Sequence, residues 1–322
     1  MEKIVCFGSD VYGETSPPLG NFVDLSAGYE HNCAIDSLGN VTCWGNNNFG
    51  QTSSPSGSFY QVSSGLRHTC GIDSSGEIEC WGDNGYEQSS PVSGNFLQVS
   101  TGDFHTCALN INSQIECWGF NASWQSTPPS GIFTEVASGS THSCAIDTTG
   151  AIHCWGDNIY GQTDAPTGNF ISISAGAYHS CAVNTTGQVE CWGDNMYAQG
   201  VGTSGNYTVV TSGFGHNCAI TDYTGGAIAA VISNPNVKSY GPPFIYLFTT
   251  VDSGVTWTQR KKIKSTLSNI TDYDFGKSMD ISSESDVSKI YSTDQAFAAL
   301  KTDGSVVTWG DSSFGGDSSG VR

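Results

Sequence analysis

Residues 22–58 read FVDLSAGYEHNCAIDSLGNVTCWGNNNFGQTSSPSGS, and a unit of the same 37-residue length follows five more times without an insertion or deletion. The six copies begin at Phe22, Phe59, Phe96, Phe133, Phe170 and Tyr207. Periods of this length are typical of repeated supersecondary units, each of which buries its apolar face only against its neighbours. The sequence therefore predicts a repeat architecture.

Each unit is expected to form three short strands. In the first copy these are residues 22–26, 31–35 and 41–45, with residues 36–40 as the turn between the last two. Turns such as Asp73-Ser74-Ser75-Gly76 place a glycine where a short hairpin loop needs a positive φ. The abundance of glycine, serine, threonine and asparagine suits such a turn-rich chain, and the predicted class is all-β.

The twelve cysteines follow the repeat. Strand alternation puts Cys33 and Cys43 on one face and directly opposite each other, at a Cα separation of about 4.5–5.5 Å that suits a disulfide. The same phases predict four further bridges, Cys70–Cys80, Cys107–Cys117, Cys144–Cys154 and Cys181–Cys191. For Cys6 and Cys218, a bond that closes a ring and two free thiols both fit the sequence. The tryptophan after each second cysteine points to the opposite face, and its recurrence predicts packing between adjacent units.

Composition restricts the environment and the partners. The formal net charge is -19, and through residue 230 the only basic residues are Lys3 and Arg67, against twenty acidic ones. Such a surface repels nucleic acid. Regularly paired cysteines predict an oxidising, extracellular or cell-surface location. The sequence contains no stretch that would span a membrane, and it begins in mid-unit, as expected of a fragment or a mature chain. Five sequons, at Asn40, Asn121, Asn184, Asn206 and Asn269, permit glycosylation.

The pattern Val-Ser-Ala-Gly-x-x-His-x-Cys-Ala-Ile-Asp, followed by Gly-x-Val-x-Cys-Trp-Gly-x-Asn-x-x-Gly-Gln, resembles the regulator of chromosome condensation repeat. The resemblance covers residues 1–224 and 287–322 and implies a β-propeller, of seven blades or alternatively six. The short repeat is similar to that of the propeller-type β-lactamase inhibitory proteins, and the paired cysteines resemble those of crinkly-type receptor kinase ectodomains. These relatives include an exchange factor, enzyme inhibitors and receptor ectodomains, so the resemblance implies a fold more than a function.

The regular pattern is interrupted at residues 225–286, which we expect to form an irregular segment or blade. Two stretches there resemble integrin-like FG-GAP blades, but the calcium loop of those blades is absent, so no metal is predicted. Because Ile228 stands where the second cysteine is expected, the sixth unit is predicted to lose its third strand. Residues 287–322 form a seventh unit in which Ala298 and Thr308 replace both cysteines.

The recurrent polar residues suggest no catalytic site. A histidine precedes each first cysteine by two positions, at His31, His68, His105, His142, His179 and His216. One interpretation is a histidine–thiolate metal site, and the other, which we favour, is a structural hydrogen bond. An active site needs one distinctive constellation, whereas these pairs are spread evenly over the units. Asp83, Asp157 and Asp194 follow Trp-Gly and are predicted to be turn residues. We expect no enzyme activity, no metal and no cofactor.

Two positions vary while their flanks do not. Between the recurrent glycine and histidine the units carry Tyr29-Glu30, Leu66-Arg67, Asp103-Phe104, Ser140-Thr141, Ala177-Tyr178 and Phe214-Gly215. These loops should emerge on one face, where aromatic side chains among small polar ones favour protein binding. The predicted contact residues are Tyr29, Glu30, Leu66, Arg67, Asp103, Phe104, Tyr178 and Phe214. The alternative is that unconstrained loops simply drift.

A second aromatic series precedes the Gly-Gln end of the units, at Tyr12, Phe49, Tyr86, Tyr160, Tyr197 and Phe314, with Trp124 one position late. Its uniformity predicts packing between blades. Taken together, the sequence predicts an extracellular, monomeric, non-catalytic propeller that binds a protein partner. The alternatives are an enzyme inhibitor of the β-lactamase inhibitory type, a guanine-nucleotide exchange factor, and a propeller hydrolase or lyase of glycans.

Overall fold

The computed structural model describes residues 10–196, 199–200, 202, 205–215, 217–221, 228–232, 244–250, 257–264, 287–292, 296–301 and 306–310. The regular elements in these residues are all β-strands, as the all-β prediction requires. No helix that could span a membrane is found among them.

The strands form antiparallel sheets, each made of consecutive strands of the chain. The first three sheets contain β1 (Phe22–Ala27), β2 (His31–Asp36) and β3 (Val41–Gly45); β4 (Phe59–Ser64), β5 (His68–Asp73) and β6 (Ile78–Gly82); and β7 (Phe96–Thr101), β8 (His105–Asn110) and β9 (Ile115–Gly119). The next two contain β10 (Phe133–Ser138), β11 (His142–Asp147) and β12 (Ile152–Gly156); and β13 (Phe170–Ala175), β14 (His179–Asn184) and β15 (Val189–Gly193).

The last two sheets complete the order. The sixth contains β16 (Tyr207–Ser212), β17 (Asn217–Thr221), β18 (Ile228–Ile232), β19 (Phe244–Thr250) and β20 (Trp257–Lys264). The seventh contains β21 (Val287–Ser292), β22 (Ala296–Lys301) and β23 (Val306–Gly310).

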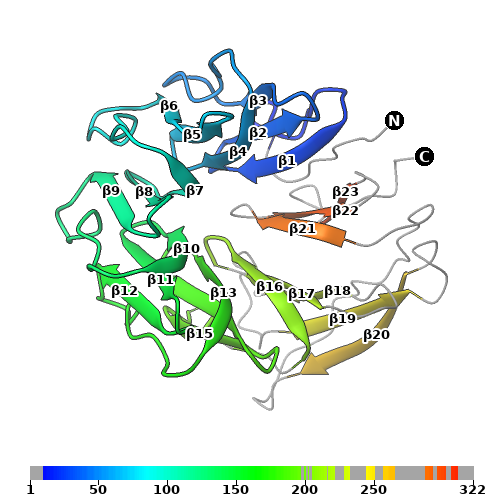
Figure 1. Ribbon diagram of the computed structural model, residues 1–322. Helices are drawn as coiled ribbons and strands as arrows, with labels where there is room; N and C mark the ends of the chain where they lie inside the picture. Colours follow the sequence, from blue (N-terminus) through cyan, green and yellow to red (C-terminus); the bar gives the residue numbers. More distant parts are fainter. Residues whose placement is uncertain are drawn as a thin grey trace.

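The sheets stand around a common centre, as the blades of a propeller do (Figure 1). The first strand of each sheet contacts the first strand of the next, from β1 through β16. Strand β21 contacts both β16 and β1 and so closes the ring. The described residues thus form seven sheets in one ring, and the seventh is the cysteine-free unit predicted from the sequence. In it Ala298 faces Thr308, at the positions that cysteines occupy elsewhere.

In the first five units the two cysteines lie opposite each other, in the register that was predicted. Cys33 pairs with Cys43 in the β2–β3 ladder, and the two are joined by a disulfide with a Cα separation of 4.0 Å. The other four predicted bridges are present at the same phases, with Cα separations of 4.0–4.1 Å: Cys70–Cys80, Cys107–Cys117, Cys144–Cys154 and Cys181–Cys191. The turn glycines adopt the positive φ that was expected, for example 89° at Gly76.

The apolar core lies between neighbouring units. Cys70 and Ile72 of the second unit form one cluster with Phe96 and Trp118 of the third. The Trp118 indole also donates a hydrogen bond of 2.9 Å to the backbone carbonyl of Gln88, in the loop between the two units. The packing between units that was predicted for the tryptophans is therefore observed. The cysteines of each disulfide pack against apolar residues of the following unit.

The sixth unit corrects one expectation. Its third strand was predicted to be lost because Ile228 occupies the cysteine position, yet β18 pairs with β17 like the third strand of every other unit. The connection is two residues longer, so that Ala230 faces Cys218. Strands β19 and β20 then extend this sheet to five strands. The predicted limits of the segment at residues 225 and 286 stay a prediction.

Several predicted features lie outside the described residues. They include Cys6, and with it the bond to Cys218, the histidine of the sixth unit and two members of the aromatic series: His216, Tyr197 and Phe314. The two stretches with FG-GAP resemblance also lie largely outside them.

Candidate functional site

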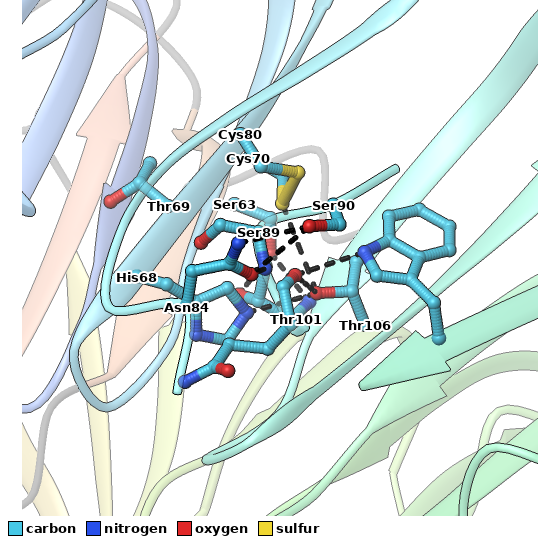
Figure 2. The surroundings of a disulfide bond; sticks show 12 residues. Ser63, His68, Thr69, Cys70, Cys80, Asn84, Ser89, Ser90, Thr101 and Thr106 are labelled. Carbon is cyan, nitrogen blue, oxygen red and sulfur yellow. Dashed lines mark hydrogen bonds between the residues drawn. A yellow bond between two sulfur atoms is a disulfide. The ribbon is translucent and has the colours of Figure 1, made fainter. Parts of the chain in front are cut away.

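A chain of side-chain hydrogen bonds joins the units on the disulfide face. The imidazole Nε2 of His68 lies 2.9 Å from Thr106 Oγ1 of the next unit, and Cys70 Sγ lies 3.8 Å from the same hydroxyl (Figure 2). The hydroxyl of Thr106 in turn donates to the carbonyl of Gln88. Equivalent bonds of 2.7–2.8 Å join four other pairs: His31–Thr69, His105–Ser143, His142–Ser180 and His179–Asn217.

These contacts explain why every described unit with cysteines carries the histidine. Since the hydroxyl proton of Thr106 points to a carbonyl, Nε2 of His68 is the donor in their bond, which makes the imidazole a neutral Nε2–H tautomer. Burial lowers the pKa of His68 to about 3, with a further contribution from the neighbouring His105 and His31. The structural hydrogen bond favoured above is the role observed. The thiols are disulfides, and the described residues contain no group of three possible metal ligands.

A recurrent glycine lets the next unit approach the histidine. A Cβ on Gly102 would overlap the carbonyl oxygen of Gly139 and the imidazole of His105. The same holds at Gly28 and Gly65 in the two preceding units. Because the obstacle includes backbone of another unit, the side chain cannot be accommodated by a change of rotamer.

Replacing Gly102 with alanine is therefore expected to lower the free energy of unfolding by about 2 kcal/mol, as overpacking of a core does. The matched control is Gly85→Ala, where a Cβ would meet only Asp83 Oδ1 at 3.4 Å. That change should stay within about 0.5 kcal/mol of the wild type. Equal effects of the two substitutions in urea unfolding would contradict the assignment.

The first variable position lines the centre of the ring in the first six units. A cavity of about 160 Å³ is lined by this residue and the two before it in six successive units. The variable residues in its wall are Tyr29, Leu66, Asp103, Ser140, Ala177 and Phe214. Asp103 accepts a hydrogen bond from Ser140, and burial nevertheless raises the pKa of its carboxyl. The prediction that these loops emerge together is confirmed by this common cavity.

The second variable position lies farther out, against the aromatic series of the preceding unit. The guanidinium carbon of Arg67 is 4.6 Å from the ring centroid of Phe49. Tyr86 contacts Phe104 with ring centroids 5.5 Å apart, and Tyr160 contacts Tyr178 at 5.4 Å. The aromatic series therefore does pack between units, as predicted.

The aromatic series is also a surface feature, which its uniformity did not suggest. Phe49, Tyr86 and Tyr160 are 43–50% exposed, and Trp124 is 70% exposed. The rings of Phe49, Tyr86 and Tyr160 each lie over the junction of two units and present part of their surface to solvent. The variable loops and this series consequently form one continuous surface, which we call the loop face.

One further position belongs to the loop face and was not predicted as part of it. It is the residue after Trp-Gly, whose backbone N–H bonds the carbonyl of the second variable residue in the same unit. Its members are Asn46, Asp83, Phe120, Asp157 and Asp194. Phe120 contacts Tyr86 with centroids 4.9 Å apart, and Asn46 donates to the Glu30 carboxylate at 2.7 Å. No signal in the sequence marked this position as part of the loop face, because three of its five members are aspartates that also fix the turn.

The aspartates at this position are also turn residues, as predicted. Asp83 Oδ1 accepts the N–H of Gly85 at 3.0 Å, and Asp194 Oδ1 accepts that of Met196 at 3.1 Å. Asn46 caps its own turn in the same way, through Asn48 at 2.8 Å. One residue thus fixes the turn and adds a polar or aromatic group to the loop face.

Comparison with known proteins identifies the unit. The model of the regulator of chromosome condensation (RCC1) repeat matches residues 22–51, 59–88, 133–162 and 170–199. Four of the units are RCC1 repeats. No curated protein matches the sequence significantly.

Solved structures with the same RCC1-like propeller fold share little sequence with this chain. The entire ectodomain of the receptor kinase CR4 from Physcomitrella patens is 22% identical, with a TM-score of 0.63, over 91% of this chain and 74% of that one. The CRINKLY ectodomain of the receptor kinase ACR4 from Arabidopsis thaliana is 20% identical, with a TM-score of 0.62, over 91% and 98%. Prp20p from Saccharomyces cerevisiae, described with its binding to Gsp1p and histones, is 18% identical, with a TM-score of 0.55, over 73% and 72%.

Proposed function

We propose that this chain is an extracellular, non-catalytic propeller that binds a protein partner through the loop face. The observation that carries the proposal is the convergence of the variable residues: six of them line one central cavity, and their neighbours pack on exposed aromatic rings. A rigid frame with a varied, aromatic surface is the arrangement expected of a binding site on a repeat protein.

The aromatic residues supply the anchors. Tyr86, Phe104 and Phe120 contact one another with centroids 4.9–6.4 Å apart, and Tyr178 contacts both Tyr160 and Phe214. Rings that are already packed against each other lose little rotamer entropy when a partner covers them, which is why aromatic residues dominate interface energies.

Two observations support an extracellular location. Disulfides of this kind persist in oxidising compartments, and five of them staple the frame. Two of the similar structures are ectodomains of receptor kinases. Inhibition of an enzyme would use the same surface, and the identity of the partner would distinguish it from a scaffold role. Nucleotide exchange is disfavoured by the disulfides.

Loss of either of two aromatic anchors is expected to weaken partner binding strongly. Phe104→Ala and Tyr178→Ala should each weaken the complex by about 2 kcal/mol, or about thirtyfold, as hot-spot truncations do. The measurement is quantitative affinity capture from extracellular fluid of the source, followed by binding titrations of each captured protein.

The matched controls are Leu38→Ala and Ile111→Ala, which change side chains that are 77% and 60% exposed. Both lie in the hairpin between the second and third strands, at the opposite end of the sheet from the loop face. A partner that depends on Phe104 and Tyr178 but not on these controls supports the proposal. If no captured protein shows that dependence, the loop face is not the binding site.

A further inference from the structure

Three junctions between units on the loop face share one geometry but differ in chemistry. In each of the three, an aromatic ring is covered by the side chain eighteen residues later, at the second variable position of the next unit. At the first-to-second junction the ring is Phe49 and the covering group is the Arg67 guanidinium, 4.6 Å from its centroid. The chain itself therefore shows that a cation fits on an aromatic ring at this place.

At the equivalent place between the fourth and fifth units the described residues supply no cation. Tyr160 is covered instead by Tyr178, which in turn contacts Phe214 with centroids 5.8 Å apart. We call these three rings the Tyr178 cluster. Tyr160 is 50% exposed and Phe214 is 40% exposed, so the cluster presents aromatic surface to solvent beside the central cavity.

Three carboxylates lie near the Tyr178 cluster. The backbone N–H of Asp194 donates to the carbonyl of Tyr178, and Asp103 lines the central cavity together with Phe214. Asp157 accepts a hydrogen bond from the Gln162 side chain, whose oxygen accepts the N–H of Tyr160. Burial raises the pKa of Tyr178, and the negative charges of the three aspartates raise it further. Gln162 donates to Asp157 Oδ2 at 3.2 Å, and Gln199 donates to Asp194 Oδ2 at 2.7 Å. These amides are uncharged donors, and the structure gives the three carboxylates no ion pair with a described residue.

We propose that the Tyr178 cluster, with Asp103, Asp157 and Asp194, receives an arginine or lysine side chain of the protein partner. This inference rests on the proposed function and specifies the chemistry of the partner. The rings attract a cation through their negative faces, and the carboxylates complement its charge in a setting where no cation of the described chain competes. Arginine suits the site better than lysine, because its planar group also stacks on a ring.

The experiment uses a small probe on the intact chain. N-acetyl-arginine methylamide is titrated into protein labelled with ¹³C in its tyrosine rings, and the neutral citrulline analogue is titrated in parallel. We expect saturable shifts of the Tyr160 and Tyr178 signals, assigned by Tyr→Phe variants, with affinity in the millimolar range and weaker at high salt. The citrulline analogue should leave these signals unchanged.

The decisive variant is Asp157→Asn with Asp194→Asn, which should weaken arginine binding about fivefold or more. Asparagine keeps the turn intact, since Asn46 makes the same turn in the first unit. The matched control, Glu77→Gln with Glu79→Gln, removes the same charge from exposed positions outside the loop face and should have no effect.

Equal shifts with arginine and citrulline, equal losses in the two double variants, or shifts caused by neutral sugars instead would each overturn the inference. Failure here is separate from failure of the proposed function. Suppose that a partner requires Phe104 and Tyr178 but binds the Asp157→Asn/Asp194→Asn variant as tightly as the wild type. The loop face then stays the binding site, and only the proposed contact with an arginine or lysine of the partner is excluded.

Discussion

Acidification from pH 7 to pH 4 is expected to unfold this protein. Burial lowers the pKa of His31, His105 and His179 to about 4 and that of His68 and His142 to about 3. In the unfolded chain each imidazole titrates near about 6.5. Between these values the unfolded state binds more protons than the folded state, so stability is complete above the unfolded pKa and falls as the pH falls.

The size of the effect follows from the number of histidines. Each proton taken up on unfolding costs about 1.4 kcal/mol of stability per pH unit, so five cost about 7 kcal/mol per unit well below the unfolded pKa. Because domains are stable by about 5–15 kcal/mol, the midpoint should lie near about pH 5.

The carboxyl groups with shifted pKa values modify this result without reversing it. Burial raises the pKa of Glu135 to about 7, and that of Asp103 is also raised, so these two groups favour the folded state as the pH falls. Hydrogen bonds hold the pKa of Asp36, Asp73 and Asp147 low, which adds to the loss of stability at low pH.

The measurement is the free energy of unfolding in urea at pH 7, 6 and 5, followed by tryptophan fluorescence. His105→Gln keeps a donor for Ser143 but cannot titrate. The free energy of unfolding of this variant should therefore fall less steeply with pH, by the contribution of about one proton. A stability that is constant between pH 7 and pH 5 would show that the buried imidazoles are protonated in the folded state.

Removal of the disulfides is expected to have a comparable effect. Each bridge joins cysteines ten residues apart and is worth about 3 kcal/mol in the chain-entropy account. Five such bridges together match the whole stability of an ordinary domain. Heating in the presence of a reductant should therefore lower the melting temperature by more than about 20 °C. At room temperature the reaction should be slow, because the first cysteine of each pair is fully buried.

A single bridge can be tested with a substitution that the chain already contains. The seventh unit has Ala298 opposite Thr308, so Cys107→Ala with Cys117→Thr copies a natural pair. The double variant should melt about 4 °C below the wild type. Calorimetry that finds no difference would mean that the neighbouring units, and not the bridge, hold the third unit together.

Much of the fold was predictable because the repeat multiplies each weak signal. The opposed phases of Cys33 and Cys43 gave the register, and a glycine such as Gly76 gave the hairpin. The sixth unit was predicted wrongly at its third strand, because a connection two residues longer places Ala230 and not Ile228 opposite Cys218. A pattern that relies on fixed spacing cannot detect a longer loop when the residue that would mark the next strand, here the second cysteine, is missing.

The loop face was predictable only in part. Variation at Asp103 and Phe104 indicated exposed loops, and they do lie together. The role of Phe120 could not be found from a single unit, because it depends on how the Tyr86 ring of the preceding unit crosses the junction. Contacts between side chains eighteen or more residues apart require the three-dimensional arrangement of two neighbouring units.

The hydrogen bonds from each histidine to the next unit also give the ring a direction. The second to fifth units each offer an imidazole on one side and a hydroxyl on the other, as at His105 and Ser143 or His142 and Ser180. Serine and threonine hydroxyls both bond the imidazole of the preceding unit, so a unit can pack against any neighbour that keeps its own histidine and hydroxyl. Whole units are thus interchangeable cassettes: duplication, loss or exchange of 37 residues would preserve the joints while bringing a new pair of loop residues to the surface.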